Sequence, residues 1–152
     1  MMRRFSISTV TVIFLLLVSC KVPPSRESFC KHPDRNGCYN FVLEFTDTTA
    51  FYDLYLCTCF DCMDARMVAI GTLPVEISAV SPEGRRYSEK VYFPLDAPVR
   101  ATYNVKEYIS LYRSKVSGTG TWNFSIKPLE PGRLVRGFRG FGIQMKMRNG
   151  ER

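Results

Sequence analysis

The sequence predicts an all-β protein, a single antiparallel β-sandwich or jelly-roll-like domain that follows a signal peptide and a short tether. Short segments in which apolar and polar residues alternate, as in strands with one buried face, run through most of the chain. Turn residues such as Gly, Pro, Asp and Ser separate these segments at regular intervals, which gives about six to eight strands. At 152 residues the chain has room for one domain with a hydrophobic core and not for two.

The first element is an export signal at residues 1–19. Two arginines precede an apolar stretch at residues 10–18, which is too short to stay in a bilayer as a permanent helix. The stretch ends in Leu-Val-Ser-Cys, which resembles the lipobox of bacterial lipoproteins. That resemblance implies cleavage before Cys20, a diacylglycerol thioether on its thiol and an acyl chain such as palmitate on its new amino end, which together anchor the protein. The alternatives are a plain secretory signal with a chance cysteine and an N-terminal membrane helix.

The residues after Cys20 indicate where such a lipoprotein would reside. Lys21 follows the cysteine instead of Asp, so the inner-membrane retention signal of enterobacterial lipoproteins is absent. The residues after Cys20 also contain no run of acidic residues, which would favour display on the outer surface. We therefore expect a protein of the bacterial cell envelope, anchored by lipid to the outer membrane on its periplasmic side.

The charge of the whole chain is +7, which raises the question of an anionic partner. Without residues 1–19, nineteen basic and fourteen acidic residues remain, a net +5, with −4 in residues 20–84 and +9 in residues 85–152. An exported protein does not normally meet nucleic acid, so we exclude that partner. The basic half is either a face toward anionic lipid, lipopolysaccharide or an acidic protein, or a solvated strand face that keeps the protein soluble.

Residues 20–38 are predicted to form a lipidated tether, and residues 39–152 the sandwich domain. The tether sequence contains three prolines, several small polar residues and charges of both signs, with little apolar periodicity. Such a segment would lift the folded domain away from the membrane.

The strand prediction is clearest in the first half of the domain. Phe41, Leu43 and Phe45 alternate with Val42 and Glu44. In the next strand one predicted face consists of Tyr52, Leu54, Leu56, Thr58 and Phe60, and the other of Asp53, Tyr55, Cys57 and Cys59. Residues 75–79 and 87–95 form a hairpin around the Ser-Pro-Glu-Gly turn at 81–84.

The second half is less regular. Residues 102–116 combine apolar positions at helical spacing with a composition typical of strands, and we expect a helical turn that leads into a strand. Residues 122–126 and 141–147 alternate as strands, and residues 134–138 are expected to form one helical turn.

The cysteines are the first candidate site. Five remain after Cys20: Cys30, Cys38, Cys57, Cys59 and Cys62. Outside the inner membrane disulfides are the default, and the odd count leaves one thiol over. Two alternatives stay open. Cys57, Cys59, Cys62 and the single histidine, His32, are ligand types that suit tetrahedral zinc, and the Cys-Phe-Asp-Cys run is a C-x-x-C of the thioredoxin-like kind. We expect no metal and no other cofactor.

No catalytic set is evident, and we expect no enzyme activity. One histidine cannot readily be matched to a nucleophile, and no Gly-rich phosphate loop is present. Acidic residues that could form a pair for glycoside hydrolysis are of the kind found on the solvent face of any β-protein. They are Glu44, Asp47, Asp53, Asp61, Asp64, Glu76 and Glu89.

The aromatic residues suggest a second kind of site, because their flat apolar faces can stack on sugar rings. Trp122, Phe124, Phe41 and Phe45 alternate as core residues do. The better candidates are tyrosines 87, 92, 103, 108 and 112, of which we select Tyr108 and Tyr112 as the platform. They make an envelope carbohydrate-binding module the alternative function.

Three stretches resemble the gliding-motility lipoproteins of the GldH type. They are residues 41–60 with their Asp-Thr-Thr turn, the hairpin at 73–95, and residues 118–146 with Gly-Thr-Trp-Asn-Phe-Ser-Ile and Gly-Phe-Arg-Gly-Phe-Gly-Ile. The resemblance implies a non-enzymatic envelope lipoprotein that binds or assembles with other envelope proteins in gliding or an associated secretion apparatus. The cluster from Cys57 to Cys62 departs from that family's pattern.

Overall fold

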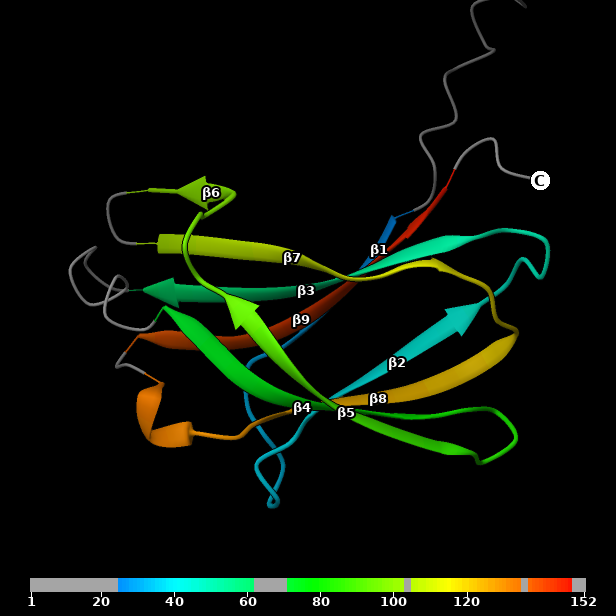
Figure 1. The fold of residues 1–152 in the computed structure, drawn as a ribbon, viewed down its shortest axis with the longest axis horizontal. Coiled ribbons are helices and arrows are strands. Elements are labelled where there is room, and N and C mark those ends of the chain that lie inside the picture. Colours follow the sequence, from blue (N-terminus) through cyan, green and yellow to red (C-terminus); the bar gives the residue numbers. More distant parts are fainter. Residues whose placement is uncertain (1–24, 62–70, 103–104, 135–136, 149–152) are drawn as a thin grey trace, which may run out of the picture.

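The chain folds into two antiparallel β-sheets packed face to face, which confirms the predicted β-sandwich (Figure 1). The computed structural model describes residues 25–61, 71–102, 105–134 and 137–148. The five-stranded sheet has the order β1 (Ser25–Cys30), β9 (Phe138–Met147), β3 (Tyr52–Asp61), β7 (Val105–Val116) and β6 (Arg100–Ala101). The four-stranded sheet has the order β2 (Tyr39–Phe45), β8 (Gly120–Pro128), β4 (Thr72–Val80) and β5 (Arg86–Pro94).

Hydrophobic side chains from the facing sides of the two sheets form the core. In β2 every second residue is buried, as the alternation predicted. In β3 the predicted inner face is buried from Tyr52 to Phe60. The largest fully buried side chains include Phe60, Phe93 and Phe141, each of which contributes about 1.5–3 kcal/mol by leaving water.

The predicted hairpin is confirmed as β4 and β5. The amide of Ser81 donates to the carbonyl of Arg85 at 2.9 Å, and the amide of Gly84 donates to the carbonyl of Ser81 at 2.9 Å. Gly84 has φ +84°, a left-handed conformation that glycine adopts at little cost. The remaining short element is a 3₁₀ helix, η1 (Pro131–Arg133), between β8 and β9. No helix in the described ranges has the length and apolar character needed to cross a bilayer.

The tether prediction is wrong from Ser25 onward. Residues 25–30 form β1, an edge strand that pairs with β9 in antiparallel register. Backbone hydrogen bonds to β9 hold this strand in the sheet. Such pairing cannot be predicted from the alternation of apolar and polar side chains. The folded domain therefore begins well before residue 39.

The strand expected within residues 102–116 is confirmed, whereas the helical turn expected before it does not occur in the described part of that segment. Residues 105–116 form one continuous strand, β7, which pairs with β3 along its length. The helical turn expected at 134–138 includes residues 135 and 136, which lie outside the described residues; the structure has a 3₁₀ helix just before it, at Pro131–Arg133, and β9 begins at Phe138. The alternation of β7 is blurred because Ile109, on the outer face of the sheet, lines a hollow, so apolar residues occur on both faces.

Two glycines in β9 allow β1 to lie close to it. Cys59 is opposite Gly140 and Phe60 is opposite Phe138, so Arg139 is the extra residue of a β-bulge. Gly140 has φ +130°, and a Cβ atom there would lie 2.1 Å from the carbonyl oxygen of Cys30. A Cβ atom at Gly142 would lie 3.0 Å from the ring of Phe29.

We predict that Gly140→Ala destabilises the domain by at least about 2 kcal/mol, because the methyl group collides with backbone and the conformation is unfavourable for alanine. Chemical denaturation measures the loss. Gly132→Ala is the matched control, since a Cβ atom there has no neighbour within 4 Å, and it should change stability by less than about 0.5 kcal/mol. Equal stability of the two variants would contradict the close approach of β1.

Candidate functional site

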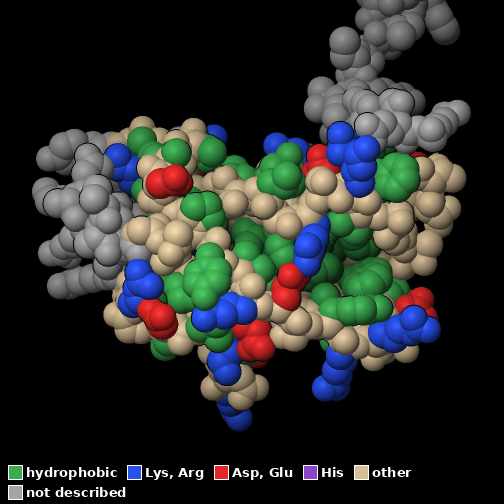
Figure 2. All heavy atoms as spheres, viewed as in Figure 1, with side chains coloured by type: hydrophobic (Ala, Val, Ile, Leu, Met, Phe, Trp, Pro, Cys, Tyr) green, Lys and Arg blue, Asp and Glu red, His purple; other side chains and the backbone are tan. Residues whose placement is uncertain are grey.

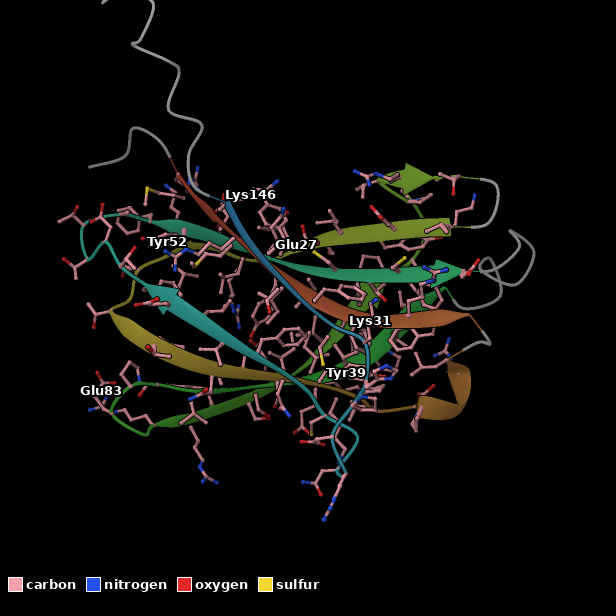
Figure 3. The ribbon with its side chains drawn as sticks, turned by 180° about the vertical axis from the view of Figure 1, so that it is seen from behind. Glu27, Lys31, Tyr39, Tyr52, Glu83 and Lys146 are labelled. Carbon is pink, nitrogen blue, oxygen red and sulfur yellow. The ribbon has the colours of Figure 1, made fainter. Side chains whose placement is uncertain are left out.

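The outer face of the five-stranded sheet contains a hollow of about 310 Å³. It is lined by residues of five strands and the segment after β1: Glu27, Phe29, Lys31, Cys57, Thr58, Cys59, Arg100, Glu107, Tyr108, Ile109 and Arg139. In Figure 3, β1 runs from beside Lys146 past Glu27 to Lys31. The volume is at the lower end of that of small-molecule sites.

The hollow exists because small residues meet on two neighbouring strands. Cys57 lies opposite Gly142 of β9, and Cys59 lies opposite Gly140. The two glycines have no side chains, so the surface over β9 is low, and the ring of Phe29 packs over Gly142. The result is a shallow apolar floor.

The rim of the hollow carries charges of both signs. The Arg100 Nε lies 3.5 Å from a carboxylate oxygen of Glu107. The Arg139 guanidinium donates to the Asp61 carboxylate at 2.5 Å, which raises the pKa of the arginine. Because both pairs are exposed, they contribute little to the stability of the fold. An apolar floor and a polar rim suit a ligand with both kinds of surface.

The predicted disulfides are absent among the described cysteines. Cys30, Cys38, Cys57 and Cys59 are free thiols. Cys57 and Cys59 lie on the outer face of the sheet, whereas Cys30 packs against the core between the sheets, so these thiols are on opposite sides. Two residues apart on one strand face, Cys57 and Cys59 are also poorly placed to bridge each other. Cys20 and Cys62 lie outside the described residues.

The thiols of the hollow are held in the protonated form. Burial raises the pKa of Cys57 to about 12. Burial, followed by the nearby Glu107 carboxylate, raises the pKa of Cys59. A redox-active C-x-x-C needs the opposite shift.

The zinc alternative gains no support from the described part of the chain. His32 follows β1, where its carbonyl oxygen accepts a hydrogen bond from the Cys30 thiol at 3.1 Å. Among the residues the structure describes, no three His, Cys, Asp or Glu side chains gather closely enough to hold a metal ion.

The tyrosine platform prediction is wrong for both selected residues. Tyr108 is 3% exposed and packs edge-to-face on Phe60, with ring centroids 6.1 Å apart. The Tyr112 ring packs against the core, and its hydroxyl donates to the Glu89 carboxylate at 2.5 Å. Both rings lie on the inner face of β7, toward the core.

Two other tyrosines of the candidate group are exposed. Tyr87 is 51% exposed and stacks on Trp122, with ring centroids 6.0 Å apart and an interplanar angle of 29°. Tyr92 is 60% exposed. The sequence alone does not single out Tyr87, because its exposure depends on how far the other sheet extends. Tyr87 is on the inner face of β5, at the end of the strand that the other sheet does not cover. Tyr103 lies outside the described residues.

Comparisons with known proteins show only distant likeness. No family model and no curated protein matches the chain. The enzymatically active domain of bacteriophage CBA120 tailspike protein 4 is similar at 11% identity and a TM-score of 0.28, with 83% of this chain and 17% of that chain covered. TmCBM61, solved with β-1,4-galactotriose, is similar at 11% identity and a TM-score of 0.26, with 88% and 94% covered. Likeness this low assigns no activity and no ligand.

We predict that Cys57 reacts with iodoacetamide at pH 8 at least about a hundredfold more slowly in the folded protein than in guanidinium, because its thiol is buried and protonated. Mass spectrometry of alkylated peptides measures both rates. Without reductant, denatured protein should yield alkylated Cys57 and Cys59. Recovery of a peptide pair joined through either residue would contradict the free thiols.

We predict that Tyr112→Phe and Glu89→Gln each cost about 1 kcal/mol at pH 7, because each removes a hydrogen bond between the sheets. The Tyr112 hydroxyl lowers the pKa of Glu89, so the carboxylate stabilises the fold above the ordinary glutamate range and loses that effect as the pH falls through the lowered pKa.

The stability difference between wild type and Glu89→Gln should therefore shrink as the pH falls below the ordinary glutamate range, as followed by urea denaturation. Glu130→Gln, at an exposed ion pair with Arg133, is the control and should change stability by less than about 0.5 kcal/mol. A Glu89 variant that behaves like this control would show that the contact is not a bridge between the sheets.

Proposed function

We propose that the protein is a non-enzymatic, lipid-anchored component of the bacterial cell envelope that acts by binding other envelope molecules. One observation carries the proposal: two arginines and a short apolar stretch precede Leu-Val-Ser-Cys, which ends at Cys20. Lipid on this cysteine would hold the protein at the outer membrane, on its periplasmic side.

The start of β1 supports a short anchor. Chain geometry limits the five residues from Cys20 to Ser25 to less than about 18 Å. Ser25 lies opposite Lys146 in the sheet. A lipid on Cys20 would therefore place the Lys146 end of the sandwich beside the membrane surface, where a basic side chain suits anionic headgroups.

The acidic residues support a binding role over catalysis. Four of those weighed as catalytic candidates lie within ion-pair distance of an arginine: Glu44 with Arg26, Asp61 with Arg139, Asp53 with Arg148, and Glu89 with Arg113. These carboxylates are therefore engaged with structural partners at the surface of the sheets. The outer hollow offers a surface with an apolar floor and a charged rim for a partner protein. By the resemblance to GldH-type lipoproteins, the partner belongs to a gliding or associated secretion apparatus.

A second candidate is carbohydrate binding, which the exposed Tyr87 ring stacked on Trp122 favours. Aromatic faces at the surface of a β-sandwich can stack on the apolar C–H faces of sugar rings.

We predict that Cys20→Ala moves the protein from the membrane fraction to the soluble fraction and abolishes labelling by radioactive palmitate, because the attachment thiol is lost. Fractionation in a bacterial host and immunoblotting measure the distribution. Cys57→Ala, a cysteine buried within the folded domain, should leave both readouts unchanged. Membrane association that persists in the Cys20→Ala variant would contradict the lipid-anchor proposal.

A further inference from the structure

The two sheets separate along the side of the sandwich where β5 and β7 face each other. The inner face of β5 is covered at one end and open at the other: Phe93 is 1% exposed and Tyr87, six residues earlier, is 51% exposed. Figure 1 shows the sheets diverging toward the turn between β4 and β5. Figure 2 shows hydrophobic side chains in the hollow between the sheets on this side, with basic and acidic groups beside them. We call this space the inter-sheet wedge, formed by Tyr87, Glu89, Tyr112, Arg113 and Trp122.

One wall of the wedge is aromatic and held in place. Tyr87 stacks on Trp122, and Trp122 packs edge-to-face against Phe45, with centroids 6.3 Å apart. Phe124 lies on the same strand face, with its ring centroid 6.3 Å from that of Trp122. The rings are fixed by their neighbours, so a flat ligand that stacks on Tyr87 meets a preformed surface and loses little freedom in ordering it.

The polar side of the wedge is a fixed group of three residues. The Glu89 carboxylate accepts hydrogen bonds from the Tyr112 hydroxyl at 2.5 Å and from the Arg113 guanidinium at 2.5 and 2.6 Å. Glu89 lies two residues from Tyr87 on the same face of β5, about 6.5–7 Å along the strand. The carboxylate and the guanidinium neutralise each other, yet a carboxylate has about four acceptor sites and a guanidinium five N–H donors, so both can take more partners.

We propose that the inter-sheet wedge binds a pyranose ring of a neutral oligosaccharide. The C–H face of the sugar stacks on Tyr87, and its hydroxyl groups bond to the free acceptor and donor positions of Glu89 and Arg113. A pair without net charge, beside an aromatic face, matches a ligand that has hydroxyls and no charge of its own. This inference rests on the carbohydrate-binding candidate and gives it a site and a ligand class.

The same strand supplies a matched control. Tyr92 is also on β5 and also exposed, but it lies on the opposite face, where Lys90 sits over its ring at 5.0 Å from the Nζ to the centroid. Tyr87 and Tyr92 thus differ in the face they occupy and not in residue type. Only Tyr87 belongs to the wedge.

The test uses Trp122, which is the single tryptophan of the chain and stacks on Tyr87. The purified full chain in detergent is titrated with neutral tri- and tetrasaccharides of galactose, glucose and mannose, and with oligogalacturonate as the charged comparison. We expect a saturable change in tryptophan emission with at least one neutral oligosaccharide, and weaker binding of oligogalacturonate.

Tyr87→Ala should weaken binding of that oligosaccharide by at least about tenfold, Glu89→Gln by at least about fivefold, and Tyr92→Ala by less than about twofold. Tyr87→Phe keeps the stacking face and should bind within about twofold of wild type. Circular dichroism of each variant confirms that it is folded.

The outcomes separate the two proposals. Saturable binding that Tyr87→Ala leaves intact, or that Tyr92→Ala removes, overturns the wedge and keeps carbohydrate binding. Absence of binding to every oligosaccharide overturns both. Equal or tighter binding of oligogalacturonate overturns the neutral ligand class.

Discussion

The hydrogen bonds from Tyr112 and Arg113 to Glu89 join the two sheets on the side where the core leaves them apart. Elsewhere the sheets are held mainly by apolar packing, which has no direction, and by the exposed ion pair between Arg26 of β1 and Glu44 of β2. At this side β7 and β5 are tied by a charged acceptor and two donors with fixed geometry. The bridge therefore sets the separation of the sheets at the wedge, and with it the exposure of the Tyr87 and Trp122 rings.

The opposite face of the five-stranded sheet follows from backbone geometry. Gly140 lets the carbonyl of Cys30 come close, and Gly142 leaves room for the ring of Phe29, so β1 packs closely against β9. A hollow therefore forms at the surface over Cys57 and Cys59. Both features use an absence of side-chain volume in β9. Gly140 and Gly142 both admit the edge strand β1 and shape the hollow. A substitution at either glycine therefore changes both the packing of β1 and the shape of the hollow.

Much of the fold could be predicted from the sequence, since β2, β3 and the β4–β5 hairpin have one buried face and regular alternation. Other parts could not, for physical reasons. β1 is held by backbone pairing, which side-chain pattern does not report. β7 has apolar residues on both faces, which hides its period of two, so the sequence does not show that Tyr108 faces the core. The number of cysteines predicts disulfides, but it does not show that Cys30 and Cys57 face opposite sides of one sheet. The wedge could not be foreseen, because it depends on where the second sheet stops covering β5.

The most direct test of the bridge is a carbon-13 NMR titration of the Glu89 side-chain carboxyl. The Tyr112 hydroxyl, and then Arg113, lower the pKa of this group. The titration midpoint should therefore lie below the ordinary value for glutamate and should move up in Tyr112→Phe. A midpoint at the ordinary value, unchanged by Tyr112→Phe, would contradict a bridge between the sheets and the fixed geometry of the wedge.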